Sequence, residues 1–177
     1  QNGKGVGRNA QYWPSDLTYL AGPARRSLLD AIEIPVDNAG NALGDTCFAS
    51  TEAAYAALGD AMKERLQGLK AVHRFGDAYK RQQVRREAAG DALTDMPDAA
   101  VRSKTPDVVH PVVRTHPHTG RKCLYVNPGF TVSVVGLEED ESRVMLGELF
   151  EHCMQTRFQY RHSWRVGDLV MWDNCST

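Results

Sequence analysis

The stretch formed by residues 158–172 limits the fold more strongly than any other part of the sequence. Large side chains alternate with polar ones over residues 158–164, which is the pattern of a strand with one covered face and one exposed face. Gly167 and Asp168 then favour a turn, and residues 169–172 (LVMW) form a continuous apolar run of the kind expected deep in a sheet sandwich. We therefore expect short strands to dominate the fold.

Other segments of the chain also carry strand or helix patterns. Apolar residues recur every four positions from Ala54 to Leu66, which predicts a single helix, capped at Ser50 or Thr51, whose apolar stripe packs in the core. The remaining predicted elements are helices at residues 80–90 and 145–154, and strands at residues 27–34, 45–49, 69–72, 108–115 and 122–126.

Composition and charge exclude several classes of function. The chain has 177 residues and a formal net charge of -1, so it has no overall field that would attract nucleic acid. No apolar run is long enough to span a bilayer, and we expect a cytoplasmic protein without a membrane partner, while homo-oligomerisation remains open. The four cysteines include no Cys-x-x-Cys pair, which argues against a zinc ribbon or a disulfide framework.

We interpret residues 1–177 as one domain, with a helical and loop excursion at about residues 77–107. The sequence starts without Met and stops at Thr177, directly after an apolar strand. These ends predict a central fragment that is incomplete on both sides.

Four short blocks follow one another in an order that carries information about function. They are residues 12–19 (YWPSDLTY), residues 44–50 (GDTCFAS) running on into AAY at 53–55, residues 110–117 (HPVVRTHP) and residues 167–174 (GDLVMWDN). In these blocks and their order, the chain resembles the family of taurine dioxygenase and 2,4-dichlorophenoxyacetate dioxygenase. The resemblance implies a mainly β fold with inserted helices, the double-stranded β-helix or jelly roll.

The resemblance also implies a chemistry. In this family, two histidines and one carboxylate hold Fe(II) and leave open positions for the cosubstrates 2-oxoglutarate and O2. Asp16 is the implied carboxylate ligand, Thr46 the implied contact to 2-oxoglutarate, and no catalytic residue is implied beyond the metal site. Pro14 stands where the family has its first metal-binding histidine, and a proline ring offers no donor atom. The family's second histidine falls beyond Thr177.

Three explanations of Pro14 remain open: an inactive relative, a natural variant that takes another ligand from elsewhere, or a sequence error, since a single base change separates histidine and proline codons. The first hypothesis for function is a dioxygenase that hydroxylates a small, anionic organic substrate and releases succinate and CO2. The alternative is a catalytically inactive jelly-roll domain that binds a carboxylate ligand or a partner chain.

Several other polar residues have simpler interpretations. His110, His116 and His118 have no acidic or cysteine partner at ligand spacing, which disfavours a metal cluster. His162 and Trp164 are expected to line the core or a pocket. The basic residues between positions 80 and 86 have no aromatic residues among them, so we interpret them as a solvated helix face and not as a nucleic-acid surface.

Overall fold

Short antiparallel strands form most of the regular structure. A computed structural model of the chain describes residues 13, 15–76 and 103–177. Within these residues, the two-stranded sheets pair β1 (Arg26–Asp30) with β9 (Leu169–Asp173), β2 (Thr46–Ala49) with β8 (Gln159–His162), and β5 (Val113–Thr115) with β6 (Lys122–Leu124). In a three-stranded sheet, β3 (Lys70–His73) lies between β4 (Val108–Pro111) and β7 (Thr131–Val134).

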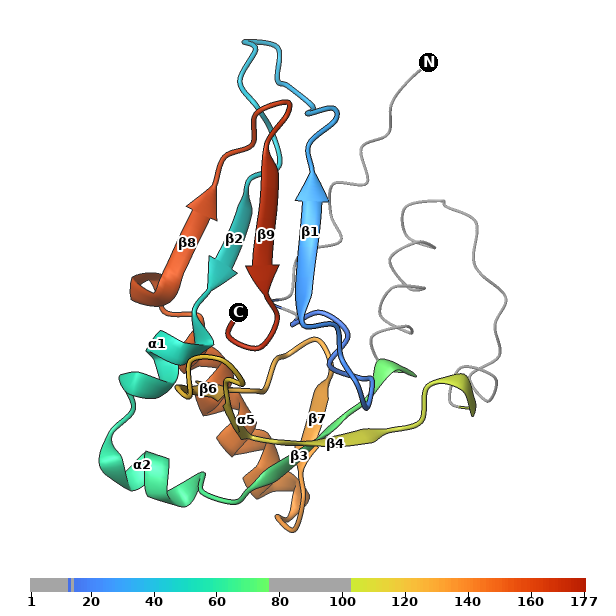
Figure 1. The fold of residues 1–177 in the computed structure, drawn as a ribbon. Helices are drawn as coiled ribbons and strands as arrows, with labels where there is room; N and C mark the ends of the chain where they lie inside the picture. Colours follow the sequence, from blue (N-terminus) through green and yellow to red (C-terminus); the bar gives the residue numbers. More distant parts are fainter. Residues whose placement is uncertain (1–12, 14, 77–102) are drawn as a thin grey trace.

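The sheets occupy two levels of the molecule. In Figure 1, β8, β2, β9 and β1 lie side by side in the upper part, and the helices and the three-stranded sheet lie below them. The rings of Phe48 on β2 and Trp172 on β9 are 5.3 Å apart, so the β2/β8 and β1/β9 sheets are in contact. The prediction of a strand-dominated fold is confirmed, with the strand expected at residues 108–115 divided at Val112.

The single helix predicted between Ala54 and Leu66 is wrong, because the chain forms two short helices there. These are α1 (Thr51–Ala56) and α2 (Asp60–Arg65). Gly59 lies between them in an extended conformation and begins α2. Ala54 and Leu66 are both fully buried, so the two helices turn their apolar sides to one core. The repeat of four is therefore preserved across a break that it cannot reveal.

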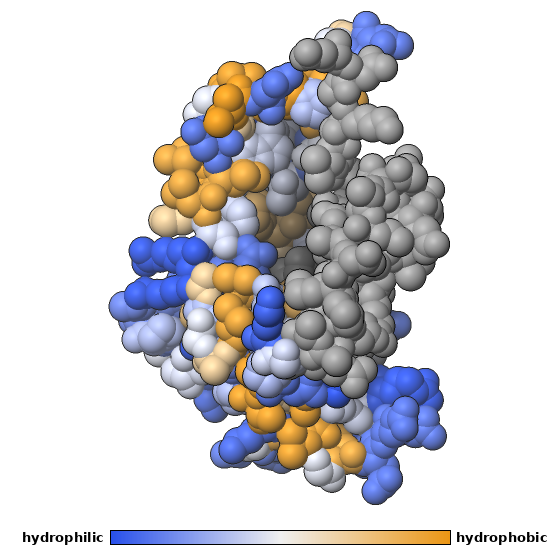
Figure 2. All heavy atoms as spheres, turned by 90° about the vertical axis from the view of Figure 1, so that its right-hand side faces the viewer, coloured by the Kyte–Doolittle hydropathy of each residue, from blue (hydrophilic) through white to orange (hydrophobic). Residues whose placement is uncertain are grey.

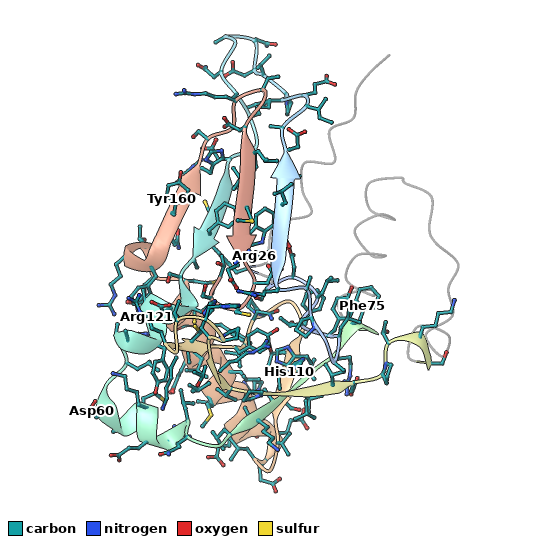
Figure 3. All side chains as sticks on the ribbon, in the orientation of Figure 1. Arg26, Asp60, Phe75, His110, Arg121 and Tyr160 are labelled. Carbon is teal, nitrogen blue, oxygen red and sulfur yellow. The ribbon has the colours of Figure 1, made fainter. Side chains whose placement is uncertain are left out.

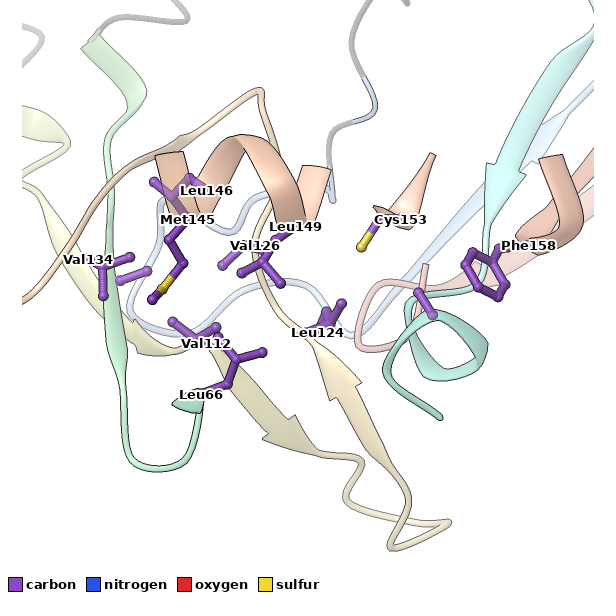
Figure 4. Close-up of a cluster of buried hydrophobic side chains, with 12 residues drawn as sticks. Leu66, Val112, Leu124, Val126, Val134, Met145, Leu146, Leu149, Cys153 and Phe158 are labelled. Carbon is purple, nitrogen blue, oxygen red and sulfur yellow. The ribbon is translucent and has the colours of Figure 1, made fainter. Parts of the chain in front are cut away.

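The helix predicted around residues 145–154 is confirmed as α5 (Glu139–Cys153). It is followed by the short 3-10 helix η1 (Thr156–Phe158). The buried face of α5 supplies much of the core, which lies between this helix and the strands β3, β5, β6 and β7 (Figure 4). The buried apolar residues of the core are Ala54, Leu66, Ala71, Val112, Leu124, Val126, Val134, Met145, Leu146, Leu149, Cys153 and Phe158.

The apolar run at residues 169–172 does not lie deep in a sandwich, contrary to the expectation. The exposed fractions are 63% for Leu169 and 58% for Met171, and Leu28, directly opposite Met171 on β1, is 59% exposed. These three side chains share one face of the β1/β9 sheet, because opposite residues and alternate residues point the same way. Figure 2, which views the molecule from the right-hand side of Figure 1, shows hydrophobic side chains at the surface. No second layer of described residues covers the β1/β9 face.

The alternation over residues 158–164 also produces a shorter strand than predicted. β8 spans four residues, Phe158 belongs to η1, and Trp164 follows the strand. Phe158 and Trp164 are buried, whereas Tyr160 is 63% exposed. The predicted covered face is therefore wrong for Tyr160, since β8 is an edge strand with β2 as its neighbour in the described sheet.

Two further expectations concern parts of the chain that the structure describes only partly. The predicted helix at residues 80–90 and most of the excursion at residues 77–107 lie outside the described residues, as does Pro14. Among the residues described, no helix combines the length and the apolar character that crossing a membrane requires.

Candidate functional site

Asp16 lies half-buried in a turn that precedes β1. The Ser27 hydroxyl donates a hydrogen bond to Asp16 Oδ2 at 2.5 Å, and Asn174 Nδ2 donates to Ser27 Oγ at 2.9 Å. A hydroxyl has one hydrogen, so a Ser27 hydroxyl that accepts from Asn174 keeps that hydrogen for Asp16. Asn174 is itself fixed, because it is buried and also donates to Ala24 O at 3.1 Å. The network thus orients one carboxylate oxygen of Asp16.

The backbone beside Asp16 is strained. Leu17 has a φ of 59°, and it is the one non-glycine residue with a positive φ in the described part of the chain. This conformation costs a residue with a Cβ about 1–2 kcal/mol, and it persists where the surrounding structure enforces it. Leu17 O accepts a hydrogen bond from Leu20 N at 2.9 Å, which closes the turn. The position of the Asp16 carboxylate is therefore determined by backbone as well as side-chain contacts.

The fourth sequence block brings the other three blocks together at the end of β9. The Ser15 hydroxyl lies 3.0 Å from Asn174 O, which joins the first block to the fourth. His116 Nε2 lies 3.2 Å from Asp173 Oδ2, which joins the third block, and the contact between the Phe48 and Trp172 rings adds the second. Arg26, labelled in Figure 3, is the first residue of β1. It lies opposite Asp173 in the β1/β9 strand pairing, at this junction.

The contact between His116 and Asp173 has a defined direction. His116 Nδ1 accepts hydrogen bonds from the backbone N–H groups of His118 and Thr119 at 3.3 and 3.1 Å, so the proton of the neutral ring lies on Nε2 and is donated to Asp173. Burial alone would raise the pKa of Asp173, but the Cys175 N–H and His116 outweigh it and lower this pKa. The pair therefore ties the β5/β6 turn to the end of β9.

The described residues do not fit an iron site. They contain no group of three or more His, Cys, Asp or Glu side chains that could hold a metal ion. His110 directs Nε2 to Leu20 O at 3.0 Å. Pro14 is outside the described residues, and its ring has no donor atom in any conformation. Of the three residues or positions at which a metal ligand is expected, only Asp16 lies within the described residues.

Thr46 belongs to a second network, at the start of β2. The Trp164 indole N–H donates to Thr46 Oγ1 at 2.9 Å, and Trp164 is buried, as the sequence predicts. The ring of His162 lies edge-on to Trp164 at 4.6 Å, and His162 Nε2 lies 3.1 Å from Asp168 Oδ2. No hydrogen bond joins this network to that of Asp16 within the described residues.

Two surface hollows lie away from both networks. One lies between β7 and α5, where Val134 and Leu146 contribute to its lining. The other is lined by residues that include Tyr55 and Arg121. Neither of these two hollows includes Asp16 or Thr46 among its lining residues.

Ser27 is the site residue that the sequence does not reveal. It stands in an apolar strand outside the four blocks, and a lone serine in a strand has no pattern that predicts a contact to a particular carboxylate. Its role follows from the antiparallel pairing that sets Ser27 opposite Trp172. This register brings Ser27 next to Asn174, which follows the last residue of β9.

Comparison with known proteins gives consistent matches over the chain. The profile of the Taurine catabolism dioxygenase TauD, TfdA family matches residues 1–177. The alpha-ketoglutarate-dependent 2,4-dichlorophenoxyacetate dioxygenase of Cupriavidus pinatubonensis is 41% identical over 164 residues, which cover 93% of this chain and 52% of that protein. The chain thus spans about half the length of the curated relatives that it matches.

Solved structures agree with these sequence matches. The crystal structure of a proposed alpha-ketoglutarate dependent 2,4-D dioxygenase from Burkholderia xenovorans superimposes with a TM-score of 0.77 at 38% identity, covering 96% of this chain and 60% of that one. The structure of AAD-2 in complex with Mn(II) and N-oxalylglycine gives a TM-score of 0.72 at 32% identity, covering 95% of this chain and 52% of that one.

Proposed function

Since the chain belongs to the Taurine catabolism dioxygenase TauD, TfdA family, we propose that this protein is an Fe(II)- and 2-oxoglutarate-dependent dioxygenase. It would use O2 to hydroxylate a small, anionic organic substrate and release succinate and CO2. The observation that carries this proposal is the family match along the whole chain, together with the 41% identical relative. An anionic substrate is supported by the names of relatives, which include 2,4-dichlorophenoxyacetate and sulfonate dioxygenases.

The proposal extends to the architecture. We assign residues 1–177 to one domain of jelly-roll type, with an excursion at about residues 77–107. The many short antiparallel strands and the likeness to dioxygenase structures support this assignment.

Asp16 is proposed as the carboxylate ligand of the metal and Thr46 as a contact to 2-oxoglutarate. The fixed orientation of Asp16 supports the first role, because outer hydrogen bonds of this kind orient metal-binding carboxylates. The second role is supported by the Thr46 hydroxyl, whose oxygen accepts a hydrogen bond from Trp164 and whose hydrogen can still be donated to an anion. Because the described residues do not fit an iron site by themselves, no reaction step is derived through the metal.

A second candidate function is favoured by Pro14. Metal affinity depends on the number and geometry of ligands, so a chain without the first histidine would bind Fe(II) weakly. Such a protein would be a non-catalytic domain that binds a carboxylate ligand or a partner chain. In this case Asp16 has a structural role only.

The Pro14→His variant separates the two functions. The parent protein, completed to the length of its relatives, is titrated anaerobically with Fe(II) and 2-oxoglutarate beside its Pro14→His variant and the control Pro14→Ala. The visible absorption band of the metal chelate is measured in each. We expect Pro14→His to bind Fe(II) at least about tenfold more tightly than Pro14→Ala, and Asp16→Ala to abolish this gain. Equal titrations for Pro14→His and Pro14→Ala would refute the dioxygenase proposal and leave the binding domain.

A further inference from the structure

We propose that Trp164 is a positioning residue for 2-oxoglutarate, and that its indole N–H directs the hydroxyl hydrogen of Thr46 toward a carboxylate of this cosubstrate. The inference rests on the proposed function, in which Thr46 contacts 2-oxoglutarate. It assigns a role to a residue that lies 118 positions from Thr46 in the sequence and outside the four sequence blocks.

The direction of the contact between Trp164 and Thr46 follows from chemistry alone. The indole N–H is a donor only, so Thr46 Oγ1 must be the acceptor at the observed distance of 2.9 Å. A threonine hydroxyl has one hydrogen. The indole N–H of Trp164 occupies one lone pair of Thr46 Oγ1, and its partial positive charge repels the hydroxyl hydrogen. The hydroxyl hydrogen must therefore point away from Trp164.

The hydroxyl hydrogen of Thr46 has no acceptor in the described part of the chain, where Thr46 Oγ1 appears only as an acceptor. A hydroxyl group that accepts one hydrogen bond can still donate its own hydrogen. A carboxylate is an acceptor only, and a hydrogen bond from a hydroxyl to a charged oxygen is roughly twice as strong as one between neutral groups. The Thr46 hydroxyl is thus oriented to donate a hydrogen bond to an anionic acceptor.

Trp164 is held in place by the same turn that begins the fourth block. Asp168 Oδ2 accepts from the Arg165 backbone N–H at 2.9 Å and contacts His162 Nε2 at 3.1 Å. His162 lies directly opposite Thr46 in the β2/β8 pairing, and its ring packs edge-on against Trp164 at 4.6 Å. These contacts therefore restrict rotation of the Trp164 side chain and keep its N–H directed at Thr46.

A purely structural role for Trp164 is the competing explanation, because a buried indole needs an acceptor for its N–H in any case. The two explanations differ in what happens when the donor is removed but the bulk of the ring is kept. If Trp164 acts through Thr46, then removal of the indole N–H matters only while the Thr46 hydroxyl is present.

The test is a double-mutant cycle on 2-oxoglutarate binding, measured by titration calorimetry. The titrations are done with Mn(II) and without O2, so that no oxidation can take place. Trp164→Phe and Thr46→Val are each expected to weaken 2-oxoglutarate binding about fivefold to tenfold, and the double variant no more than Thr46→Val alone. Thr46→Ser keeps the hydroxyl and should bind like the parent. Trp172→Phe is the matched control, because Trp172 lies on β9 and the indole that donates to Thr46 is that of Trp164.

A second variant keeps the test decisive if Trp164→Phe folds poorly. Replacement of Trp164 by benzothienylalanine keeps the shape of the indole and exchanges its N–H for sulfur, and it should weaken binding as Trp164→Phe does. Additive losses in the double variant, or unchanged binding in the benzothienylalanine protein, would overturn the inference while the proposed function stands. Absence of 2-oxoglutarate binding in both the parent protein and its Pro14→His variant would overturn both.

Discussion

His73 shows how burial of one side chain makes folding depend on pH. It lies on the central strand β3, is fully buried, and neither ring nitrogen has a hydrogen-bond partner in the described residues. Its ring lies 5.1 Å from that of His110. Burial, and secondly the neighbouring His110, lower the pKa of His73 from 6.5 to about 4. Protonation of the His73 ring is therefore less favourable in the folded protein than in the unfolded chain.

The sign of the pH effect follows from this lowered pKa. Between about pH 4 and pH 6.5 the unfolded chain binds a proton at His73 that the folded chain does not bind, so the free energy of unfolding falls as the pH falls. At about 1.4 kcal/mol for each pKa unit, the loss from pH 7 to pH 4.5 is about 2–3 kcal/mol. We expect the His73→Phe variant to lack this part of the pH dependence in urea unfolding.

The control for His73 is His118, an exposed histidine in the β5/β6 turn. His118→Phe should retain the pH dependence of the parent protein. If His73→Phe and the parent lose the same free energy of unfolding between pH 7 and pH 4.5, then His73 is protonated in the folded state and its proposed burial effect is wrong.

At the level of single residues, the sequence predicts the candidates but not their surroundings. Asp16 and Thr46 stand in blocks with a recognisable family pattern, so their positions could be named in advance. Ser27 and the contact between Trp164 and Thr46 depend on strand pairings between distant segments. No local pattern encodes such pairings, because they are fixed by the tertiary structure.

The helical elements illustrate a second limit of prediction from sequence. The cap of α1 was predictable, since a serine before a helical segment commonly accepts from a backbone N–H. The break at Gly59 was not, because both helices use the same core and keep one apolar repeat. Glycine weakens a helix by about 1 kcal/mol, which is small enough for tertiary packing to decide whether a helix continues.

The cap of α1 gives a prediction for this element. Ser50 Oγ accepts from Ala53 N at 3.2 Å, and its loss leaves an N–H of the first turn without its partner. We expect Ser50→Ala to lower the free energy of unfolding by about 1 kcal/mol, measured by urea denaturation. Ser50→Asp retains an acceptor at the cap and should stay close to the parent. Equal losses in both variants would show that the cap itself contributes nothing.

For the molecule as a whole, the family and the dominance of strands could be predicted, but the exposure of β9 could not. A continuous apolar run indicates that a strand is suited to burial, and it does not indicate which segment covers it. In the described residues, the β1/β9 ribbon has a covered side, where Trp172 contacts Phe48, and an exposed apolar side. The strand over residues 169–172 was therefore predicted correctly, but the burial of both of its faces was not.

The exposed side of the β1/β9 ribbon determines how this chain should behave in isolation. Leu28, Leu169 and Met171 form a contiguous apolar face, each more than half exposed. Exposed apolar faces on short edge strands favour association between chains. We therefore expect the isolated 177-residue chain to self-associate, with an average mass in sedimentation experiments that rises over a roughly tenfold range of concentration.

Charge on this face should reverse the association. The double variant Leu28→Lys and Met171→Lys places two ammonium groups directly opposite each other, and like charges on paired chains oppose contact between apolar faces. Val144→Lys is the matched control, because Val144 is 54% exposed but lies on α5, away from the ribbon. Only the double variant should sediment as a monomer at all concentrations. A parent chain that is already monomeric, or an equal effect of Val144→Lys, would show that the β1/β9 face does not drive association.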